Sequence, residues 1–494
     1  METIKIDISK GWMPDLIPFE MPIGSLIDSK NLLPYEEGLK PMPGKVTYSS
    51  NAAAGTPLYG EEFEDSSGAK YVFIGSTTKL YRLETNKSLT DISKLATTYS
   101  SSVTRWHFEK YNEWIIATNY ADAPQVLQGL TAANYIDLGG SPPKAKYVVF
   151  SNGHLMFFYL NEGGTVDPRK VIWSAYENVE NYTKSVTTRS DSKVLRASKG
   201  KITGAVKLGG AVAIFHERSI TTAWYMGAPV AFDWNENTVK NAGAIEGTII
   251  VIGGIAYFFD DKDIYKFDNT NIVPIGAGVR TTLVNDINLD YLYRNSTAQD
   301  LKNGLAFWSY ASLASTDGTP DTILCYNTVT GVWSYIEMSH HCLFNLQRVA
   351  LNMDNMDAEY PNTDDIPFSL DTNFWQTTQV VACMNTDGKI NILTGPVLKG
   401  NIETAEVVMK DNAIYLTDRI RPKIQKPTTA DISARIGYRY LETDDVAYSN
   451  PNTLNNEGFI DIMQAGRLLR CQLTTGLHQG IRSIDIEATR LSKY

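Results

Sequence analysis

One pattern repeats along most of this sequence: a turn residue leads into a short apolar run, and a shorter alternating run follows within a few residues. Gly, Asn and Asp bound these runs, which indicates β-strands joined as hairpins. Aromatic residues make up 11% of the chain, which also favours strands. The apolar runs read KYVFIG (70–75), WIIATN (114–119), HLMFFYL (154–160), AVAIFHE (211–217), IAYFFDD (255–261), LAFWSYA (305–311) and, more weakly, VVACMN (380–385).

The distance between successive runs limits the architecture. Measured at one position in each run, the spacing is 43, 41, 56, 44, 50 and 75 residues. Four-stranded propeller blades repeat at roughly 40–50 residues, which covers most of these steps. The pattern therefore predicts an all-β chain in which residues 51–400 form an irregular β-propeller of about six or seven blades, with the apolar runs as inner strands buried on both faces. A set of stacked β-sandwich hairpins is the alternative. The positions compared are Tyr71, Trp114, Leu155, Ala211, Ile255, Leu305 and Val380.

The two ends of the chain lack this repeat. Residues 1–50 are rich in proline and read as an extended N-terminal arm that lies across other elements. Residues 401–494 alternate well, as in ISARIGYRYLE (432–442), and predict the strands of a separate C-terminal β-sandwich. Strands near both chain ends often make one terminal module, so we expect the two ends to form a β-sandwich platform domain together.

The longest step between runs contains an acidic insertion at residues 349–372. The insertion carries six acids and no Lys or Arg, so it can bury little surface and is expected to project as a loop. One interpretation is a tip that contacts a partner or faces a channel, and the other is a solvated loop without a role. The candidate contact residues are Asp354, Asp357, Glu359, Asp364 and Asp365.

The most basic stretch of the chain is LTDRIRPKIQKP (416–427). In a strand, Arg419, Arg421 and Lys423 would share one face. We consider that this face docks on an acidic partner or on phosphate. The alternative is a solvated edge strand whose charge protects it from pairing with other chains.

Charge and cysteine content exclude several classes of protein. Lys and Arg number 45 against 55 Asp and Glu, a net charge of −10, which argues against a basic protein that binds nucleic acid by neutralising phosphates. Four cysteines without a CxxC pair make no disulfide framework and indicate a reducing assembly compartment. We expect no signal peptide and no membrane insertion, because no stretch approaches 18 consecutive apolar residues.

Motifs that carry catalysis are missing from the sequence. It has no P-loop, no GxSxG and no HExxH, and nothing pairs its six histidines with a nucleophile. In the run His340-His341-Cys342, strand geometry would let only His340 and Cys342 share a metal, and two further ligands are not evident. We therefore predict no catalytic, cofactor-binding or metal-binding residue.

A propeller that hydrolyses glycans would need two carboxylates facing one pocket, which sequence spacing does not reveal. Acids in the predicted turns supply the candidates for that alternative. They are Asp122, Asp260, Asp261 and Asp387.

The order of several segments resembles one protein family. DSKNLLPYEEGLKPMPGK (28–45) is followed mid-chain by ITGAVKLGGAVAIFHERSITTAWYMGAP (202–229). Then come KNAGAIEGTIIVIGGIAYFFDDKDIYKFDNTNIVPIGAGV (240–279), TILCYNTVTGVWSYIEM (322–338) and GRLLRCQLTTGLHQGIRSIDIEATRL (466–491). In this order, over most of the chain, they are similar to the tail hub proteins of short-tailed bacteriophages, also called nozzle or packaged-DNA stabilisation proteins. The insertion and the part before residue 200 match the family least.

The resemblance implies a structural virion protein and no enzyme. It implies a ring of six copies below the portal and its adaptor that retains packaged double-stranded DNA and conducts it during ejection. The implied partners are further copies of the chain, the adaptor or head-to-tail connector, and tail fibre or tail needle proteins, while DNA passes without specific binding. The implied location is the virion tail, after assembly in the cytoplasm of the host bacterium, with no cofactor.

Two physical arguments agree with this implication. The central channel of one propeller is too narrow for duplex DNA, so the conduit must be the axis of a ring, and a closed ring needs repeated heterologous faces. An acidic wall repels DNA and keeps it mobile, whereas contacts that neutralise phosphates would retard it. The alternative functions are a propeller glycan hydrolase and a receptor-binding propeller that uses the insertion.

Overall fold

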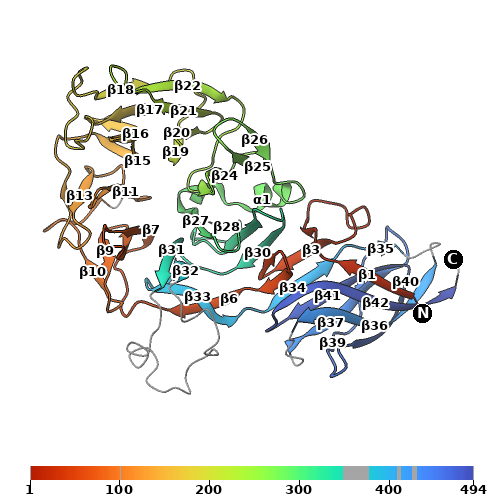
Figure 1. Cartoon of the computed structure of the whole chain (residues 1–494). Helices are drawn as coiled ribbons and strands as arrows, with labels where there is room; N and C mark the ends of the chain where they lie inside the picture. The colour runs from red at the N-terminus through yellow and green to blue at the C-terminus, as the bar shows by residue number, and fades with distance from the viewer. Residues whose placement is uncertain (1, 101, 349–377, 409–412, 426–430, 493–494) are drawn as a thin grey trace.

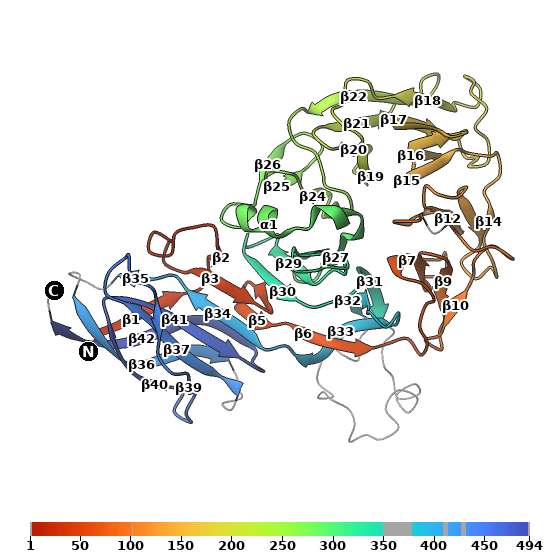
Figure 2. The ribbon, with the colours of Figure 1, turned by 180° about the vertical axis from the view of Figure 1, so that it is seen from behind.

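The computed structural model describes residues 2–100, 102–348, 378–408, 413–425 and 431–492. These residues form two bodies, a ring of antiparallel sheets and a β-sandwich beside it (Figure 1). Seen from behind, the ring and the sandwich again lie side by side (Figure 2). The prediction of an all-β propeller with a β-sandwich from the chain termini is confirmed.

The ring contains seven four-stranded blades within the described residues. In the first six blades the four strands follow one another along the chain. Blade one comprises β7 (Pro57–Glu64), β8 (Lys70–Ser76), β9 (Leu80–Leu83) and β10 (Leu89–Asp91). Blade two comprises β11 (His107–Tyr111), β12 (Trp114–Thr118), β13 (Gln125–Gln128) and β14 (Ile136–Asp137). Blade three comprises β15 (Lys144–Ser151), β16 (His154–Glu162), β17 (Thr165–Trp173) and β18 (Asp191–Val194).

The next three blades repeat the same order. Blade four comprises β19 (Ile202–Leu208), β20 (Ala211–His216), β21 (Ile220–Tyr225) and β22 (Phe232–Val239). Blade five comprises β23 (Ile250–Ile252), β24 (Ile255–Phe259), β25 (Ile264–Phe267) and β26 (Ile272–Pro274). Blade six comprises β27 (Ser296–Asp300), β28 (Leu305–Tyr310), β29 (Thr322–Asn327) and β30 (Trp333–Glu337). Between blades five and six lie the helix α1 (Arg280–Asp286) and the 3-10 helix η1 (Leu289–Arg294).

Blade seven joins distant parts of the chain. Its strands β31 (Cys342–Arg348), β32 (Thr378–Met384) and β33 (Ile390–Val397) are completed by β6 (Pro43–Thr47) from the N-terminal segment. Val46 lies opposite Ile392 in this antiparallel pair. The backbone hydrogen bonds between β6 and β33 therefore close the ring, because they join the segment before blade one to the last blade.

The apolar runs form the second strand of each blade, one position further from the axis than the expected inner strand. Every residue of β20 and of β28 is buried, because neighbouring blades cover both faces. The innermost strands alternate instead. In β7, Leu58 and Gly60 are buried, while Tyr59 and Glu61 keep some exposure on the side of the central tunnel.

The sandwich packs two sheets built from both chain ends. One sheet, called sheet A here, has the order β4-β5-β42-β36-β40, with β1 paired to β42. The other sheet contains β3, β34, β41, β37 and β38, with β2, β35 and β39 at its sides. The N-terminal strands are β1 (Glu2–Asp7), β2 (Gly11–Trp12), β3 (Ser25–Lys30), β4 (Leu32–Tyr35) and β5 (Gly38–Pro41). The C-terminal strands are β34 (Gly400–Thr404), β35 (Val407–Val408), β36 (Ile414–Gln425), β37 (Ser433–Arg439), β38 (Ala447–Tyr448), β39 (Asn452–Thr453), β40 (Ile460–Gly466), β41 (Leu468–Thr475) and β42 (Gly480–Ser492).

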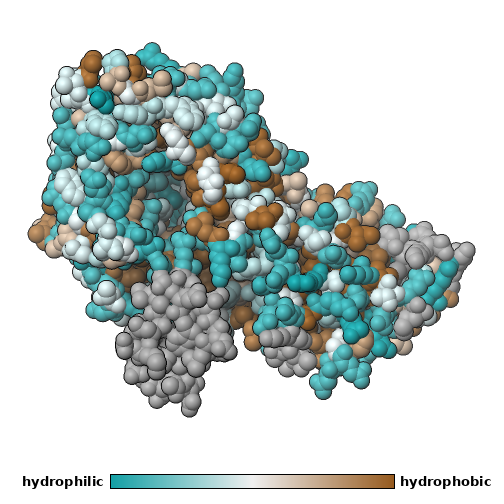
Figure 3. Space-filling model, viewed as in Figure 1, coloured by the Kyte–Doolittle hydropathy of each residue, from teal (hydrophilic) through white to brown (hydrophobic). Residues whose placement is uncertain are grey.

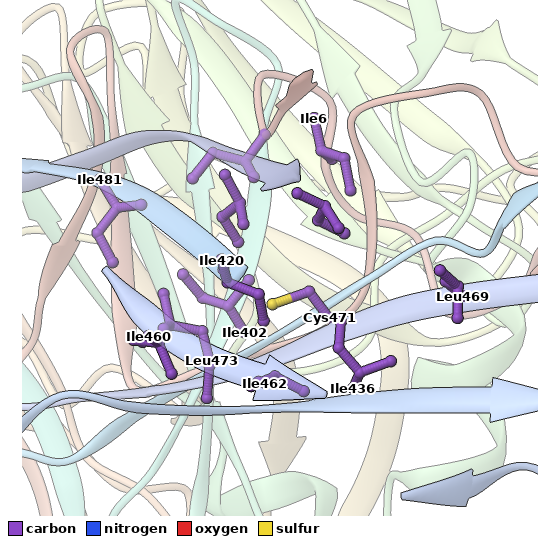
Figure 4. Close-up of a cluster of buried hydrophobic side chains, with 14 of the residues drawn as sticks. Ile6, Ile402, Ile420, Ile436, Ile460, Ile462, Leu469, Cys471, Leu473 and Ile481 are labelled. Atoms are coloured by element: carbon purple, nitrogen blue, oxygen red, sulfur yellow. The ribbon is translucent and has the colours of Figure 1, made fainter. Parts of the chain in front are cut away.

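Side chains from both ends of the chain meet in the core of the sandwich (Figure 4). Ile6 comes from β1, whereas Ile420, Cys471 and Ile481 come from strands more than 400 residues further along the chain. All of them are almost fully buried, so the sandwich depends on pairing the two ends of the chain.

One sheet connects the propeller to the sandwich through a single parallel residue pair, Lys30 with Tyr335. β30, the outer strand of blade six, pairs with β3, and the sheet then continues through β34 and β41 to give twelve strands. At the junction, the Tyr335 hydroxyl donates a hydrogen bond to Asp28 Oδ1 at 2.7 Å, and the Asn31 backbone N–H donates to the Tyr335 carbonyl at 2.8 Å. The two bodies are therefore joined by a sheet and not only by a linker.

Candidate functional site

The residues predicted from the acidic insertion lie outside the described part of the chain. Asp354, Asp357, Glu359, Asp364 and Asp365 all fall within residues 349–377. Their role as partner contacts therefore stays a prediction.

The basic segment is β36, and it lies inside sheet A. β36 pairs with β42 along its whole length, whereas β40 pairs only with Tyr415 to Ile420 on the other side. The half of the strand that carries Arg421 and Lys423 is therefore paired on one side only, as the edge-strand alternative expects. Along the strand, Ile420 and Pro422 are buried, whereas Arg419, Arg421 and Lys423 point away from the sandwich core. The three basic side chains therefore share one face, as the alternation of the sequence predicts.

Carboxylates of the neighbouring strand offset part of this positive charge. Arg419 Nε lies 3.4 Å from Glu487 Oε2, and Lys423 Nζ lies 3.2 Å from Asp485 Oδ2. Both acids belong to β42. Such mixed pairing suits docking on a protein surface of either charge better than it suits capture of free phosphate.

Apolar groups complete this outer face of sheet A. The guanidinium carbons of Arg419 and Arg421 lie 4.9 and 4.7 Å from the ring centre of Phe459, a cation–π geometry. On the next strand Met463 is 75% exposed. We call the set Arg419, Arg421, Lys423, Phe459 and Met463 the outer platform face. Stacked arginines beside an exposed methionine are typical of interface surfaces.

A second group of polar residues lines the tunnel of the propeller, and sequence reasoning missed it. Figure 3 shows a hydrophilic hollow at the centre of the ring. Glu61 on β7 and Glu109 on β11, the innermost strands of blades one and two, are partly buried. Burial raises the pKa of each carboxyl to about 8, and the charge of Glu109 adds to the increase at Glu61. Both groups therefore hold protons at neutral pH more readily than free acids do.

Rings and a guanidinium pack beside these carboxyls. The Tyr59 and His107 rings are stacked 5.8 Å apart, and His107 meets Tyr147 edge-on at 5.1 Å. Arg105 lies 5.0 Å from the Tyr59 ring centre. Burial, helped by the charge of Arg105, lowers the pKa of His107 to about 3, so this imidazole is neutral. The inner strands of blades one, two and three therefore contact one another through these side chains.

The sequence signal for this group is the alternation in PLYGEEFE (57–64) and HFEKY (107–111). Polar residues recur at every second position in strands that precede the apolar runs. That pattern indicates one wet face on each innermost strand, which is where a propeller places its tunnel.

The His340-His341-Cys342 run has structural partners. His340 Nε2 lies 2.6 Å from Ser309 Oγ, and His340 Nδ1 lies 2.7 Å from the Met338 carbonyl oxygen. Both ring nitrogens are thus occupied, and burial lowers the pKa of His340 to about 4. Among the described residues, no three or more His, Cys, Asp or Glu side chains are placed to hold a metal ion.

The four candidates for a glycan hydrolase lie in turns between the second and third strands of blades two, five and seven. Asp260 and Asp261 are adjacent in blade five, whereas Asp122 and Asp387 belong to other blades. Asp122 Oδ2 accepts a backbone hydrogen bond from Ser100 at 3.1 Å, and Asp387 Oδ1 accepts one from Lys389 at 3.0 Å. These two acids therefore stabilise turns.

Comparisons with known proteins report the fold alone. No protein-family model and no curated protein sequence matches the chain. The extracellular domain of the putative hybrid two-component system BT4673 from B. thetaiotaomicron is 9% identical to this chain, with a TM-score of 0.41. The match covers 85% of this chain but only 47% of that protein, so the chain spans about half the length of that protein. Virginiamycin B lyase from Staphylococcus aureus is 8% identical over 71% of this chain and 97% of its own, with a TM-score of 0.41. BamB from Moraxella catarrhalis is 10% identical over 97% of this chain and 98% of its own, with a TM-score of 0.31.

Across the described ranges, no helix combines the length and the apolar character that crossing a bilayer requires.

Proposed function

We propose that this protein is a structural subunit of the tail of a short-tailed bacteriophage, the tail hub or nozzle. Six copies form a ring below the portal and its adaptor, and the ring retains packaged double-stranded DNA and conducts it during ejection. The ordered resemblance of segments between residues 28 and 491 to that family suggests this role.

The observation that carries the proposal is the hydrogen-bonded junction of β30 with β3, which joins propeller and sandwich in one twelve-stranded sheet. A ring closes only when successive subunits meet at a fixed rotation, and heterologous contacts without that constraint give open filaments. A hydrogen-bonded sheet holds the two bodies of one subunit at a fixed angle, whereas a flexible linker would let that angle vary. Rigid coupling is therefore what a ring subunit with two separate contact surfaces needs.

The side chains that join the inner strands of blades one, two and three support a DNA path outside the propeller. They are Tyr59, His107 and Tyr147. The DNA conduit in this proposal is therefore the axis of the ring of chains. With a net charge of −10 per chain, the ring offers few neutralising contacts to the duplex.

The outer platform face supplies a contact surface for the neighbouring subunit or for the adaptor. Its two arginines stack on the Phe459 ring, and Glu487 of β42 offsets the charge of Arg419. A partner that binds this face therefore has to desolvate few isolated charges. The acidic residues Asp354 to Asp365 are a further contact with tail fibre, tail needle or receptor in this proposal.

A binding and retention experiment tests the function. Heads that carry portal and adaptor but lack this protein are mixed with the purified full-length chain, and nuclease-resistant DNA is then measured. We expect the chain to bind the heads and to raise the fraction of protected DNA. Heads that never bind the chain, and that leak DNA equally with and without it, would contradict the proposal.

A further inference from the structure

A groove of about 620 Å³ lies on the outer rim of the propeller, between blades three and four. Its walls are the start of β18, the loop before that strand at residues 184–190, and the turn that leads into β22. β18 and β22 are the outermost strands of their blades, and among the described strands each pairs with one neighbour only. Both lie on the side of the ring away from the sandwich (Figure 1), so the groove is separate from the outer platform face.

Large apolar side chains are exposed at this groove. Val186 and Val230 line it, and they are 71% and 61% exposed. Trp224 and Met226, which come shortly before Val230 in the chain, are exposed as well. Exposed apolar side chains that gather in one region mark interaction sites, whereas single ones do not. The rim between these two blades therefore has the composition of an interaction surface.

Arg189 brings a positive charge to the wall of this groove. Its guanidinium carbon lies 4.9 Å from the ring centre of Tyr176, and its Nη1 donates a hydrogen bond to the Tyr225 hydroxyl at 3.2 Å. In the described part of the chain, no carboxylate forms an ion pair with Arg189, and its Nε and Nη2 make no hydrogen bond. Neither nitrogen is buried, so both can donate to the two oxygens of one ligand carboxylate.

Hydrogen bonds hold the backbone of Arg189 in a conformation that few residues with a Cβ adopt. Its φ is 57°, in the left-handed region. Its N–H donates to the Ser185 carbonyl at 2.9 Å, and its carbonyl accepts from Trp173 Nε1 at 2.8 Å. Strained backbone persists where the surrounding structure fixes it, and it gathers at binding sites. These bonds therefore fix the place from which the Arg189 side chain meets the groove.

The remaining charges of the groove leave one acceptor for a ligand. Lys184 Nζ lies 3.7 Å from Asp191 Oδ1, and Lys193 Nζ lies 3.4 Å from Glu236 Oε1, so both lysines are paired. Asp233 also lines the groove and is exposed, and across the described ranges no base forms an ion pair with it. The groove thus offers a guanidinium to an anion and a carboxylate to a hydrogen-bond donor.

An extended peptide with an acidic side chain matches this combination. Its carboxylate would pair with Arg189, and its apolar side chains would cover Val186 and Val230. Its backbone N–H groups would donate to Asp233 or to the open edge of β18 or β22, as in strand addition. A nucleic acid would instead leave the valines uncovered and bring its phosphates close to Asp233. The combination of charge and apolar surface therefore favours a peptide.

We propose that this groove binds an extended segment of another protein in which an Asp or Glu is flanked by apolar residues, with the carboxylate on the Arg189 guanidinium. The uncompensated guanidinium and the exposed valines beside it carry this assignment. It goes beyond the structural role proposed above and does not depend on ring formation, because one chain contributes the whole groove.

The test uses the full-length chain and peptides of known sequence. A library of random eight-residue peptides, the length of β22, is selected on the chain, and binding of the enriched peptides is measured by fluorescence anisotropy. We expect enrichment of Asp or Glu between apolar residues, with dissociation constants of about 100 μM or below. Arg189→Asn should weaken binding about tenfold, because Asn tolerates the left-handed backbone but cannot pair with a carboxylate. Val186→Ser combined with Val230→Ser should weaken it about fivefold.

A double-mutant cycle shows whether the peptide carboxylate meets Arg189. Replacing the acidic residue of the peptide by its amide should cost about tenfold with the unchanged chain and little with Arg189→Asn. Arg218→Asn is the matched control, because Arg218 is an exposed arginine in the β20–β21 turn, outside the groove. It should leave peptide affinity unchanged, and circular dichroism confirms that each variant is folded.

Four results would overturn the proposal. The first is a selection in which no acidic peptide binds, and the second is an amide replacement that costs as much with Arg189→Asn as with the unchanged chain. The third is a short single-stranded DNA that binds more tightly than every peptide and is lost with Arg189→Asn. The fourth is self-association of the chain that Arg189→Asn abolishes, which would make a second copy the occupant.

Discussion

The propeller and the sandwich are built from the chain in opposite ways. Each of the first six blades uses strands that follow one another within about 25–50 residues, whereas the sandwich pairs β1 with β42 across nearly the whole chain. A blade is thus specified by local hairpins, and the sandwich only by contacts between the two ends. Blade seven lies between these cases, because β6 closes it from the N-terminal side. Ring closure and sandwich formation therefore depend on the same N-terminal segment.

The largest expected effect comes from the two cores. Phe215 packs 5.0 Å from Phe258 between blades four and five, and Ile486 is fully buried in the sandwich. Phe215→Ala should lower the free energy of unfolding by about 3–5 kcal/mol, and Ile486→Ala by about 2–5 kcal/mol. Calorimetry measures both. Because the twelve-stranded sheet couples the bodies, each variant should shift one shared transition, and two transitions that move independently would contradict that coupling.

The tunnel carboxyls should make stability fall with rising pH. The folded-state pKa of Glu61 is about 8 against its usual 4.5, so the folded chain binds more protons than the unfolded chain between these values. Stability is therefore lost as pH rises from about 4.5 to about 8. Glu61→Gln should raise the free energy of unfolding at pH 9 by about 1–3 kcal/mol and leave it nearly unchanged at pH 4.

Denaturant titrations at the two pH values measure this difference. Glu64→Gln is the matched control, because Glu64 ends the same strand in an exposed position. An equal effect of both substitutions at pH 9 would show that the tunnel environment of Glu61 is not the cause.

A smaller effect is expected at the junction of the two bodies. Tyr335→Phe removes the 2.7 Å hydrogen bond to Asp28 while keeping the ring. Asp28 Oδ2 still accepts from Asn401 Nδ2 at 2.6 Å, so the loss should be about 1–2 kcal/mol. Denaturant unfolding measures the loss, and amide exchange shows its location. Protection should decrease in both β3 and β30, and a decrease confined to one of them would argue against a coupled junction.

The outer platform face should affect assembly with little effect on stability. Arg421→Glu combined with Met463→Glu changes two exposed side chains and keeps the Lys423–Asp485 pair, so the free energy of unfolding should change by no more than about 1 kcal/mol. Ring formation or binding to adaptor-bearing heads should be lost, as measured by light scattering after size-exclusion chromatography. Lys302→Glu, an exposed change in a propeller turn, is the control. Assembly that survives the double substitution would remove this face from the interface.

The sequence allowed prediction of those parts that depend on local pattern. Runs such as AVAIFHE and LAFWSYA have the length and burial of propeller strands, and their spacing indicates the number of blades. Their rank within the blade was wrong by one strand, because a strand buried on both faces looks the same from sequence whether it is first or second from the axis. The shared face of Arg419, Arg421 and Lys423 followed from simple alternation.

Long-range pairings could not be predicted in the same way. Nothing in PGKVT (43–47) indicates that it pairs with a strand some 345 residues later, and nothing in β36 shows that β40 pairs with its first half.

Electron microscopy of the purified chain bound to portal–adaptor heads tests the central claim most directly. The account predicts six copies around the tail axis, with density for DNA along the axis of that ring and none through a propeller tunnel. A chain that stays single on these heads, or DNA that threads the tunnel of one propeller, would contradict it.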